Sequence, residues 1–239
     1  MNRRQGLIVL LISACFCVVQ GCTEKLPQYG AERQLYWPGA RQQVWAVAPA
    51  VDLSGQRQVD PLLQGDLLFQ QLQQVSGITA IPVNRVVEVY SSLRIEKVQS
   101  EEQAALVCDL LGCDALLVPT VTAYDPYNPP KFGAALQMFA HGQSYVRPAA
   151  VDVRELARRA TPPPVESVPP PQQGSFVQVV GVFDAANGSV RDAVNRYASG
   201  RSDPSGPLGN KEYFVSMDRY CGFVYHSLIE KLISEAGHQ

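Results

Sequence analysis

The chain has 239 residues, of which 46% are hydrophobic and 18% are charged, and its formal net charge is −2. A chain of this size and composition can bury one hydrophobic core of ordinary size, so we expect one folded domain rather than two. The mildly acidic balance, without a cluster of basic residues, argues against binding to nucleic acid or to an extended anionic lipid surface.

The first 22 residues have the pattern of a bacterial export signal. Arg3 and Arg4 precede an apolar run over residues 7–19, which leads to Cys22. A basic start, a short apolar run and a small residue before the cleavage site are typical of such signals. The apolar run is also short for a membrane-spanning helix, which needs at least about 18 apolar residues. Residues 19–22, Val-Gln-Gly-Cys, resemble the lipobox of bacterial lipoproteins, in which the cysteine thiol carries diacylglycerol after cleavage. Ordinary secretion with an incidental cysteine is the alternative.

This resemblance implies that residues 1–21 are removed and that residues 22–42 form a lipidated leash before a periplasmic domain over residues 43–239. In lipoproteins of this kind an acidic residue after the cysteine favours retention at the inner membrane, and here that position holds Thr23. We therefore expect an outer-membrane protein that faces the periplasm. Because one acyl chain anchors a protein only marginally and two anchor it stably, a multiply acylated Cys22 is a sufficient anchor.

The first predicted strand covers residues 43–49, which are apolar almost throughout, as in a strand covered on both faces. Asp60 as N-cap and Pro61 at the first helical position predict that a helix follows. Apolar residues recur along it at helical spacing, and Gly77 stands where a C-cap is expected. Its other face is rich in glutamine, and we expect that face to lie in solvent: Gln64, Gln70, Gln71, Gln73 and Gln74.

The next stretch predicts a short strand over residues 78–83 and a helix over residues 85–93 with Asn84 as its cap. Ser100 and Gln103 match a capping box, in which two side chains satisfy free backbone N–H groups at the start of a helix. A second helix is therefore expected to begin at Ser100.

Gly112 is expected to end that helix. A strand over residues 115–124 follows, in which Pro119 indicates a sheet edge or a bulge, because proline has no N–H to donate. After a turn rich in proline, residues 132–139 can return as the second strand of a hairpin.

The C-terminal part contains one more strand and two helices. Residues 176–183 predict the strand, and Val190 to Tyr197 fit a short helix after the turn at Asn187 and Gly188, although this turn could instead close a hairpin. An amphipathic helix over residues 212–236 closes the chain and places Cys221 on its apolar stripe.

The order of these elements, together with residues 111–115 (Leu-Gly-Cys-Asp-Ala), resembles a group of bacterial envelope domains. The group includes the curli-secretion lipoprotein, the amino-terminal domain of TolB and the lipoprotein activators of penicillin-binding proteins. The likeness covers roughly residues 43–140 and 176–235. It implies an α/β fold, with a single mixed sheet flanked by helices as a two-layer or three-layer sandwich, and it brings no catalytic motif.

An insertion is expected at about residues 141–175, where six prolines fall within residues 161–173. A loop of this length is usually either functional or disordered. The functional alternative is a partner-binding or pore-forming insertion, since the curli-secretion lipoprotein builds a membrane barrel from hairpins in this fold. The prolines and the charged residues 154–159 do not fit membrane strands, so we favour a disordered or surface loop.

Three cysteines remain in the mature chain besides the lipidated one: Cys108, Cys113 and Cys221. An odd number cannot all pair within one chain. A bridge between Cys108 and Cys113 requires a sharp turn that brings the Cα atoms within about 7 Å. Buried free thiols are the simpler interpretation, and the bridge stays open.

No catalytic constellation is found in the sequence: there is no phosphate-binding glycine loop, nucleophile elbow or zinc-binding helix motif. We therefore expect no cofactor and no metal. The three histidines, His141, His226 and His238, are scattered, and we expect His226 to be a surface or satisfied side chain rather than a ligand.

Three functions are compatible with these observations. The favoured one is a non-enzymatic lipoprotein that binds or positions another envelope component, with exposed tyrosines as contact residues: Tyr124, Tyr127 and Tyr145. The first alternative is a self-associating subunit of an outer-membrane export apparatus. The second alternative is an enzyme with an unrecognised site.

Overall fold

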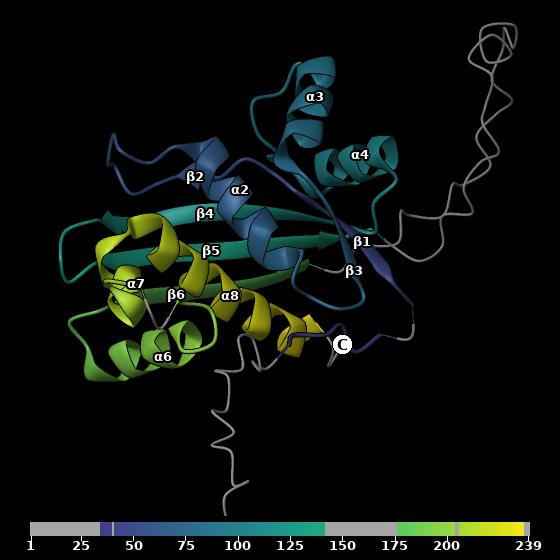
Figure 1. The fold of residues 1–239 in the computed structure, drawn as a ribbon. Helices are drawn as coiled ribbons and strands as arrows, with labels where there is room; N and C mark the ends of the chain where they lie inside the picture. Colours follow the sequence, from purple (N-terminus) through teal and green to yellow (C-terminus); the bar gives the residue numbers. More distant parts are fainter. Residues whose placement is uncertain (1–33, 40, 142–175, 204–205, 237–239) are drawn as a thin grey trace, which may run out of the picture. The chain divides into compact units, whose positions relative to one another are not determined.

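The computed structural model describes residues 34–39, 41–141, 176–203 and 206–236, which form an α/β fold around one mixed sheet of six strands (Figure 1). The strand order is β3-β1-β4-β5-β6, and β2 pairs with β4 beyond the end of β1. The strands are β1 (Gln43–Val47), β2 (Val51–Asp52), β3 (Ile78–Ile81), β4 (Ala115–Asp125), β5 (Lys131–Ala140) and β6 (Phe176–Asp184). The predicted fold class is confirmed. Most of the proposed insertion, and the whole of residues 1–33, lie outside the described residues.

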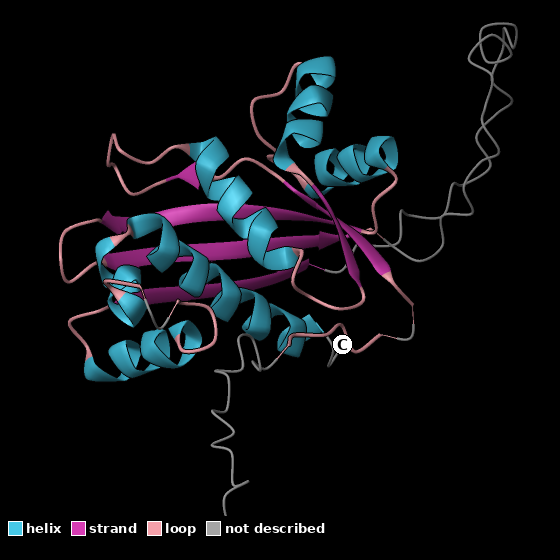
Figure 2. Cartoon of the chain, in the orientation of Figure 1, coloured by secondary structure: helices cyan, strands magenta, loops and turns pink. Residues whose placement is uncertain are grey.

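Helices flank the sheet and connect its parallel strands (Figure 2). Their bounds are α2 (Pro61–Leu72), α3 (Val83–Leu93), α4 (Glu101–Leu111), α6 (Gly188–Ala198), α7 (Glu212–Val215) and α8 (Met217–Ala236), with a short 3₁₀ helix at Gly209–Lys211. Because β1 is parallel to both β3 and β4, it needs crossover connections, which α2, α3 and α4 supply. β5 and β6 are antiparallel to their neighbours, so a tight turn suffices between β4 and β5.

The predicted starts of two helices, and the predicted end of one of them, are confirmed by their cap geometry. The Asp60 carboxylate accepts hydrogen bonds from the backbone N–H groups of Leu62 and Leu63 at the start of α2. The Ser100 hydroxyl oxygen accepts from the N–H of Gln103 at 3.3 Å at the start of α4. Gly112 ends α4 in the left-handed conformation, with φ of 67°.

Other expectations about helix ends are wrong. α2 ends at Leu72, five residues before Gly77, and Gly77 instead leads into β3. α3 begins at Val83 behind Pro82, so Asn84 lies inside the helix and does not cap it. The closing helix is broken in two, because Ser216 is extended between α7 and α8.

Of the two alternatives predicted for Pro119, a sheet edge or a bulge, the sheet edge is wrong, and the irregular pairing of β4 lies slightly further along, between Val121 and Ala123. β4 lies inside the sheet, with β5 on one side and β1 and β2 on the other. Pro119 pairs in register with Leu136 of β5, and on its other side it lies between the residues paired with β1 and those paired with β2. Its missing N–H therefore falls in the break between two short partner strands, where no ladder bond is lost.

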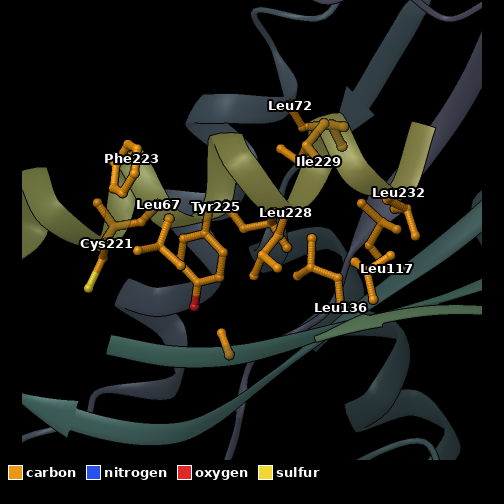
Figure 3. Packing of buried hydrophobic residues seen from close by; sticks show 14 of the residues in the cluster. Leu67, Leu72, Leu117, Leu136, Cys221, Phe223, Tyr225, Leu228, Ile229 and Leu232 are labelled. Carbon is orange, nitrogen blue, oxygen red and sulfur yellow. The ribbon is translucent and has the colours of Figure 1, made fainter. Parts of the chain in front are cut away.

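Two hydrophobic clusters occupy opposite faces of the sheet, since they take alternate residues of β1 and β4. The larger cluster lies under α2 and α8, and Figure 3 shows Leu228 and Leu232 of α8 pointing to the sheet beside Leu136 and Leu117. Cys221 belongs to this cluster, as its position on the apolar stripe predicts. The smaller cluster lies under α3 and α4 and contains both Cys108 and Cys113.

The prediction of a solvated glutamine face on α2 is wrong for two of its members. Gln64 and Gln71 are 1% and 8% exposed. The hydroxyl of Tyr225 donates to Oε1 of Gln64 at 3.0 Å, and the hydroxyl of Tyr197 donates to Oε1 of Gln71 at 2.7 Å. These tyrosines come from α8 and α6, more than a hundred residues later, so nothing near α2 in the sequence indicates them.

Candidate protein-interaction surface

β6 is the last strand of the sheet, and its outer edge has no strand partner among the described residues. Strand β5 pairs with one edge of β6 along the register from Phe176 to Asp184. On the outer side, the Lys231 ammonium of α8 reaches the carbonyl oxygen of Val180 at 3.4 Å. The edge therefore presents backbone N–H and C=O groups that a further strand could pair with.

The two faces of β6 differ sharply in exposure. Val177 and Val179 are buried under α8. The alternate residues Phe176, Val180 and Val182 point to the opposite face and are 41%, 49% and 59% exposed. A strand with apolar side chains on both faces is expected to be covered on both, and here the covering on one face is missing among the described residues.

The same side of the sheet continues across β5, where the small residues Gly133 and Ala135 are themselves buried. Ala135 lies beside Val180, and Gly133 lies beside Val182. A Cβ atom on Gly133 would lie 2.8 Å from Oγ1 of Thr122, next to the irregular pairing between Val121 and Ala123, so β4 approaches closely at this point. We call this side of the sheet the open face and define it by these residues: Thr120, Gly133, Ala135, Gln137, Phe176, Gln178, Val180 and Val182.

The open face carries no formal charge. Residues 132–140 and 176–183 contain no Asp, Glu, Lys or Arg. At one end, Lys131 and Asp184 lie opposite each other in register and form an ion pair of 3.8 Å. At the other end, the rings of Phe139 and Phe176 are in contact at 5.3 Å between centroids. An occupant of this surface would meet apolar and amide groups, with charges only at the rim.

The tyrosines proposed as contact residues have different surroundings. Tyr127 is 75% exposed in the turn between β4 and β5. Tyr124 is half-buried on the face that α8 covers, with its ring 6.1 Å from that of Phe132, and burial raises the pKa of its phenol. Tyr145 lies outside the described residues, as does Cys22, which the sequence predicts to be lipidated. Sequence reasoning identified β6 as a strand but did not identify its uncovered face, because an apolar strand predicts covering without saying which helix supplies it.

No group of three or more His, Cys, Asp or Glu side chains among the described residues could hold a metal ion. His226 is largely buried against the ring of Tyr197, and its Nδ1 is buried without a hydrogen-bond partner, so the expected surface or satisfied side chain is not observed. Burial, with a contribution from Arg201, lowers the pKa of His226 to about 4.

Within the described part of the chain, none of the helices combines the length and the apolar character that crossing a bilayer requires.

Comparisons with known proteins give structural likenesses alone. No family model and no curated protein matches the chain. The LpoB C-terminal domain from Salmonella enterica is 9% identical, with a TM-score of 0.39 over 62% of this chain and 86% of that one. Lipoprotein GNA1162 from Neisseria meningitidis is 13% identical, with a TM-score of 0.35 over 67% of this chain and 99% of that one. The PelC dodecamer from Paraburkholderia phytofirmans is 11% identical, with a TM-score of 0.32 over 81% of this chain and 91% of that one. At identities and TM-scores this low, function has to be argued from the chain's own residues.

Proposed function

We propose that this protein is a non-enzymatic lipoprotein, anchored to the outer membrane through Cys22 and facing the periplasm, that binds an extended segment of another envelope protein along β6. The export signal and the lipobox support the location. The observation that carries the binding proposal is the outer edge of β6, which has no strand partner among the described residues, together with the exposed Val180 and Val182 beside it.

An edge strand is a template for pairing with another chain, and proteins that do not use it usually protect it with charge, proline or a bulge. β6 has nine residues and contains no proline. Its register with β5 runs from Phe176 to Asp184 without a shift. Residues 176–183 carry no charge, and in the part of the chain that the structure describes, the Lys231 side chain is the protection seen at this edge, where it reaches Val180. A strand added to β6 would gain backbone hydrogen bonds along this length.

The chemistry of the open face indicates the kind of segment that fits. In an added strand, alternate side chains lie over the same face as Val180 and Val182, where small and apolar neighbours leave no partner for a charge. The occupant is therefore an extended segment with apolar or small residues at every second position. The Lys131–Asp184 pair at the rim could accept a polar residue at one end of that segment.

A photo-crosslinking amino acid at position 182 of the full-length protein tests this proposal in intact cells. We expect an adduct with a second envelope protein, mapped by mass spectrometry to one extended segment of that partner. Val180→Lys should reduce the adduct at least about tenfold, because the contact would then bury an ammonium group without a partner. Val215→Lys is the matched control, since Val215 is 62% exposed on α7 and is not a residue of the open face.

Two results would contradict the proposal. Equal adduct yields for Val180→Lys and Val215→Lys would mean that the open face is not the contact. An adduct between two copies of this chain, together with a native mass of many copies in mild detergent, would favour the alternative of a self-associating export subunit, with the same edge as its interface.

A further inference from the structure

A pair of buried cysteines lies at the junction of α4 and β4. α4 ends with Gly112 in the left-handed conformation, and the backbone N–H of Cys113 then donates to the carbonyl oxygen of Cys108 at 3.0 Å. This is the six-residue Schellman closure, in which the residue after the left-handed one packs against the residue five positions earlier. The turn therefore folds the side chain of Cys113 back onto that of Cys108.

The separation of the two residues permits a covalent bridge. The hydrogen bond limits how far apart the two Cα atoms can be. A straight path would run from Cα of Cys108 to its carbonyl oxygen, across the 3.0 Å hydrogen bond, and on to Cα of Cys113. Its length is about 7 Å at most. The real path is bent and shorter, so the Cα atoms fall within the range that disulfides span. The side chains also lie together: the two residues are 1% and 5% exposed in one cluster, and the Cys113 thiol contributes to raising the pKa of Cys108.

We propose that Cys108 and Cys113, which are free thiols in this structure, form a disulfide when the chain folds in an oxidising compartment. The inference goes beyond partner binding, and in the cell it rests on the proposed export. The oxidant is a small-molecule or protein disulfide. One cysteine thiolate attacks it and displaces a thiolate, and the second cysteine attacks the mixed disulfide and releases the other. Two electrons and two protons leave the pair and end on the two thiols of the reduced oxidant.

The timing of this step follows from burial. In the folded dithiol, the Cys113 contact and burial raise the pKa of Cys108, which leaves little of the reactive thiolate. Both thiols are also shielded from a bulky oxidant. Oxidation therefore precedes the packing of α4 against β4, and the finished bond is protected from reduction.

The bridge would lie where several elements meet. The residue after Cys113 is Asp114, whose carboxylate accepts from the backbone N–H of Val44 in β1 at 2.8 Å. The carbonyl oxygen of Asp114 accepts from the N–H of His141, just after β5. A disulfide at this turn ties the end of α4 to the point where β1, β4 and β5 are held together.

Peptide mass spectrometry tests the proposal, and Cys221 is an internal control because it lies in the other cluster. One sample of the protein is unfolded in guanidinium and treated with N-ethylmaleimide directly, and a second sample is reduced before this treatment. Both are then digested with trypsin.

Cleavage after Lys97 and Lys131 yields one peptide, residues 98–131, that holds both cysteines. A second peptide, residues 220–231, holds Cys221. Before reduction we expect no maleimide on peptide 98–131 and one on peptide 220–231. After reduction, peptide 98–131 should gain two. Cys113→Ser should leave one maleimide on that peptide without reduction.

Two sources of protein separate this proposal from that of export. Full-length protein refolded from denaturant with oxidised glutathione tests the turn itself, and two maleimides on its peptide 98–131 before reduction would overturn the inference. Protein extracted from cell envelopes should give the same closed peptide, and an open peptide from envelope-located chain would overturn it for the cell. A closed peptide after refolding but an open one in a chain found only in the cytoplasm would instead count against export.

Discussion

At the scale of single residues, the buried glutamines of α2 are the polar groups on which packing between distant elements depends. Gln71 accepts from Tyr197 of α6 and lies so close to α8 that a Cβ atom on Gly222 would be 3.3 Å from its Nε2. Gln64 accepts from Tyr225 of α8 in the same way. Both tyrosine hydroxyls are removed from water and need an acceptor inside the protein. The glutamine side-chain amides supply it, which explains why these polar side chains are buried.

We therefore predict that Gln71→Leu lowers the free energy of unfolding by about 1–3 kcal/mol, because it leaves the Tyr197 hydroxyl buried without an acceptor. Adding Tyr197→Phe should recover much of this loss, since replacing both partners of a buried hydrogen bond is far less costly than replacing one. Urea unfolding of the two single variants and the double variant measures the coupling. Effects that simply add would show that the hydrogen bond contributes nothing beyond packing.

The buried His226 should make the free energy of unfolding depend on pH. Its folded pKa of about 4 lies below the ordinary value of 6.5, because burial disfavours the imidazolium. As the pH falls below 6.5, the unfolded chain takes up a proton that the folded chain refuses, so the folded state loses stability until the pH reaches about 4. From pH 7 to about pH 4.5, the wild type should lose up to about 2 kcal/mol more than His226→Gln.

Urea unfolding of both proteins at the two pH values measures this difference. Carboxylates titrate in both proteins and cancel in the comparison. Parallel losses in the two proteins would show that His226 is not held neutral by the fold.

At the scale of elements, the end of α4 shows an element boundary that is set by the conformation of a single residue. Gly112 and Gly188 both have open space where a Cβ atom would lie, but only Gly112 has a positive φ, 67°. We predict that Gly112→Ala destabilises the protein by about 1–2 kcal/mol, because an L-residue is strained in the left-handed region. Gly188→Ala at the start of α6 is the matched control and should be neutral or slightly stabilising. Thermal unfolding of both variants decides the matter, and equal shifts would exclude the backbone explanation.

The contrast between local and distant causes explains which elements could be predicted from the sequence. Asp60, Ser100 and Gly112 mark helix ends through hydrogen bonds or backbone angles within a few residues, and these signals were sufficient. Pro119 is different, because its effect depends on where β1 stops and β2 starts, about seventy residues earlier. Local chemistry therefore predicted most helices and every strand except the two-residue β2, and it failed where a distant partner decides the environment.

At the scale of the whole molecule, the same limit applies to the candidate surface. The apolar character of residues 176–183 predicts a strand, but whether Val180 faces a helix or solvent depends on how many helices the chain can place on each side of the sheet. In the described residues, α2 and α8 cover one side and α3 and α4 cover the other only near β1 and the start of β4. β6 lies beyond the reach of α3 and α4, and this arrangement leaves the open face.

The location of the protein depends on Cys22, and the anchor can be tested apart from the fold. If residues 1–21 are removed and the thiol and new amino terminus are acylated, trypsin should release residues 22–25 as a lipid-bearing peptide from outer-membrane fractions. Each buried CH₂ contributes about 0.8 kcal/mol, so two or more chains hold the protein firmly whereas an unacylated terminus does not. Cys22→Ser should therefore leave the outer-membrane fraction.

Cys221→Ser is the control for loss of a thiol, because Cys221 is buried under α8 and should have no effect on location. Density-gradient separation of the two membranes, with immunoblotting of each fraction, measures the distribution of all three proteins. If Cys22→Ser and the wild type distribute alike, the lipobox interpretation is wrong. The open face of β6 would then have to find its partner without a membrane anchor to concentrate it there.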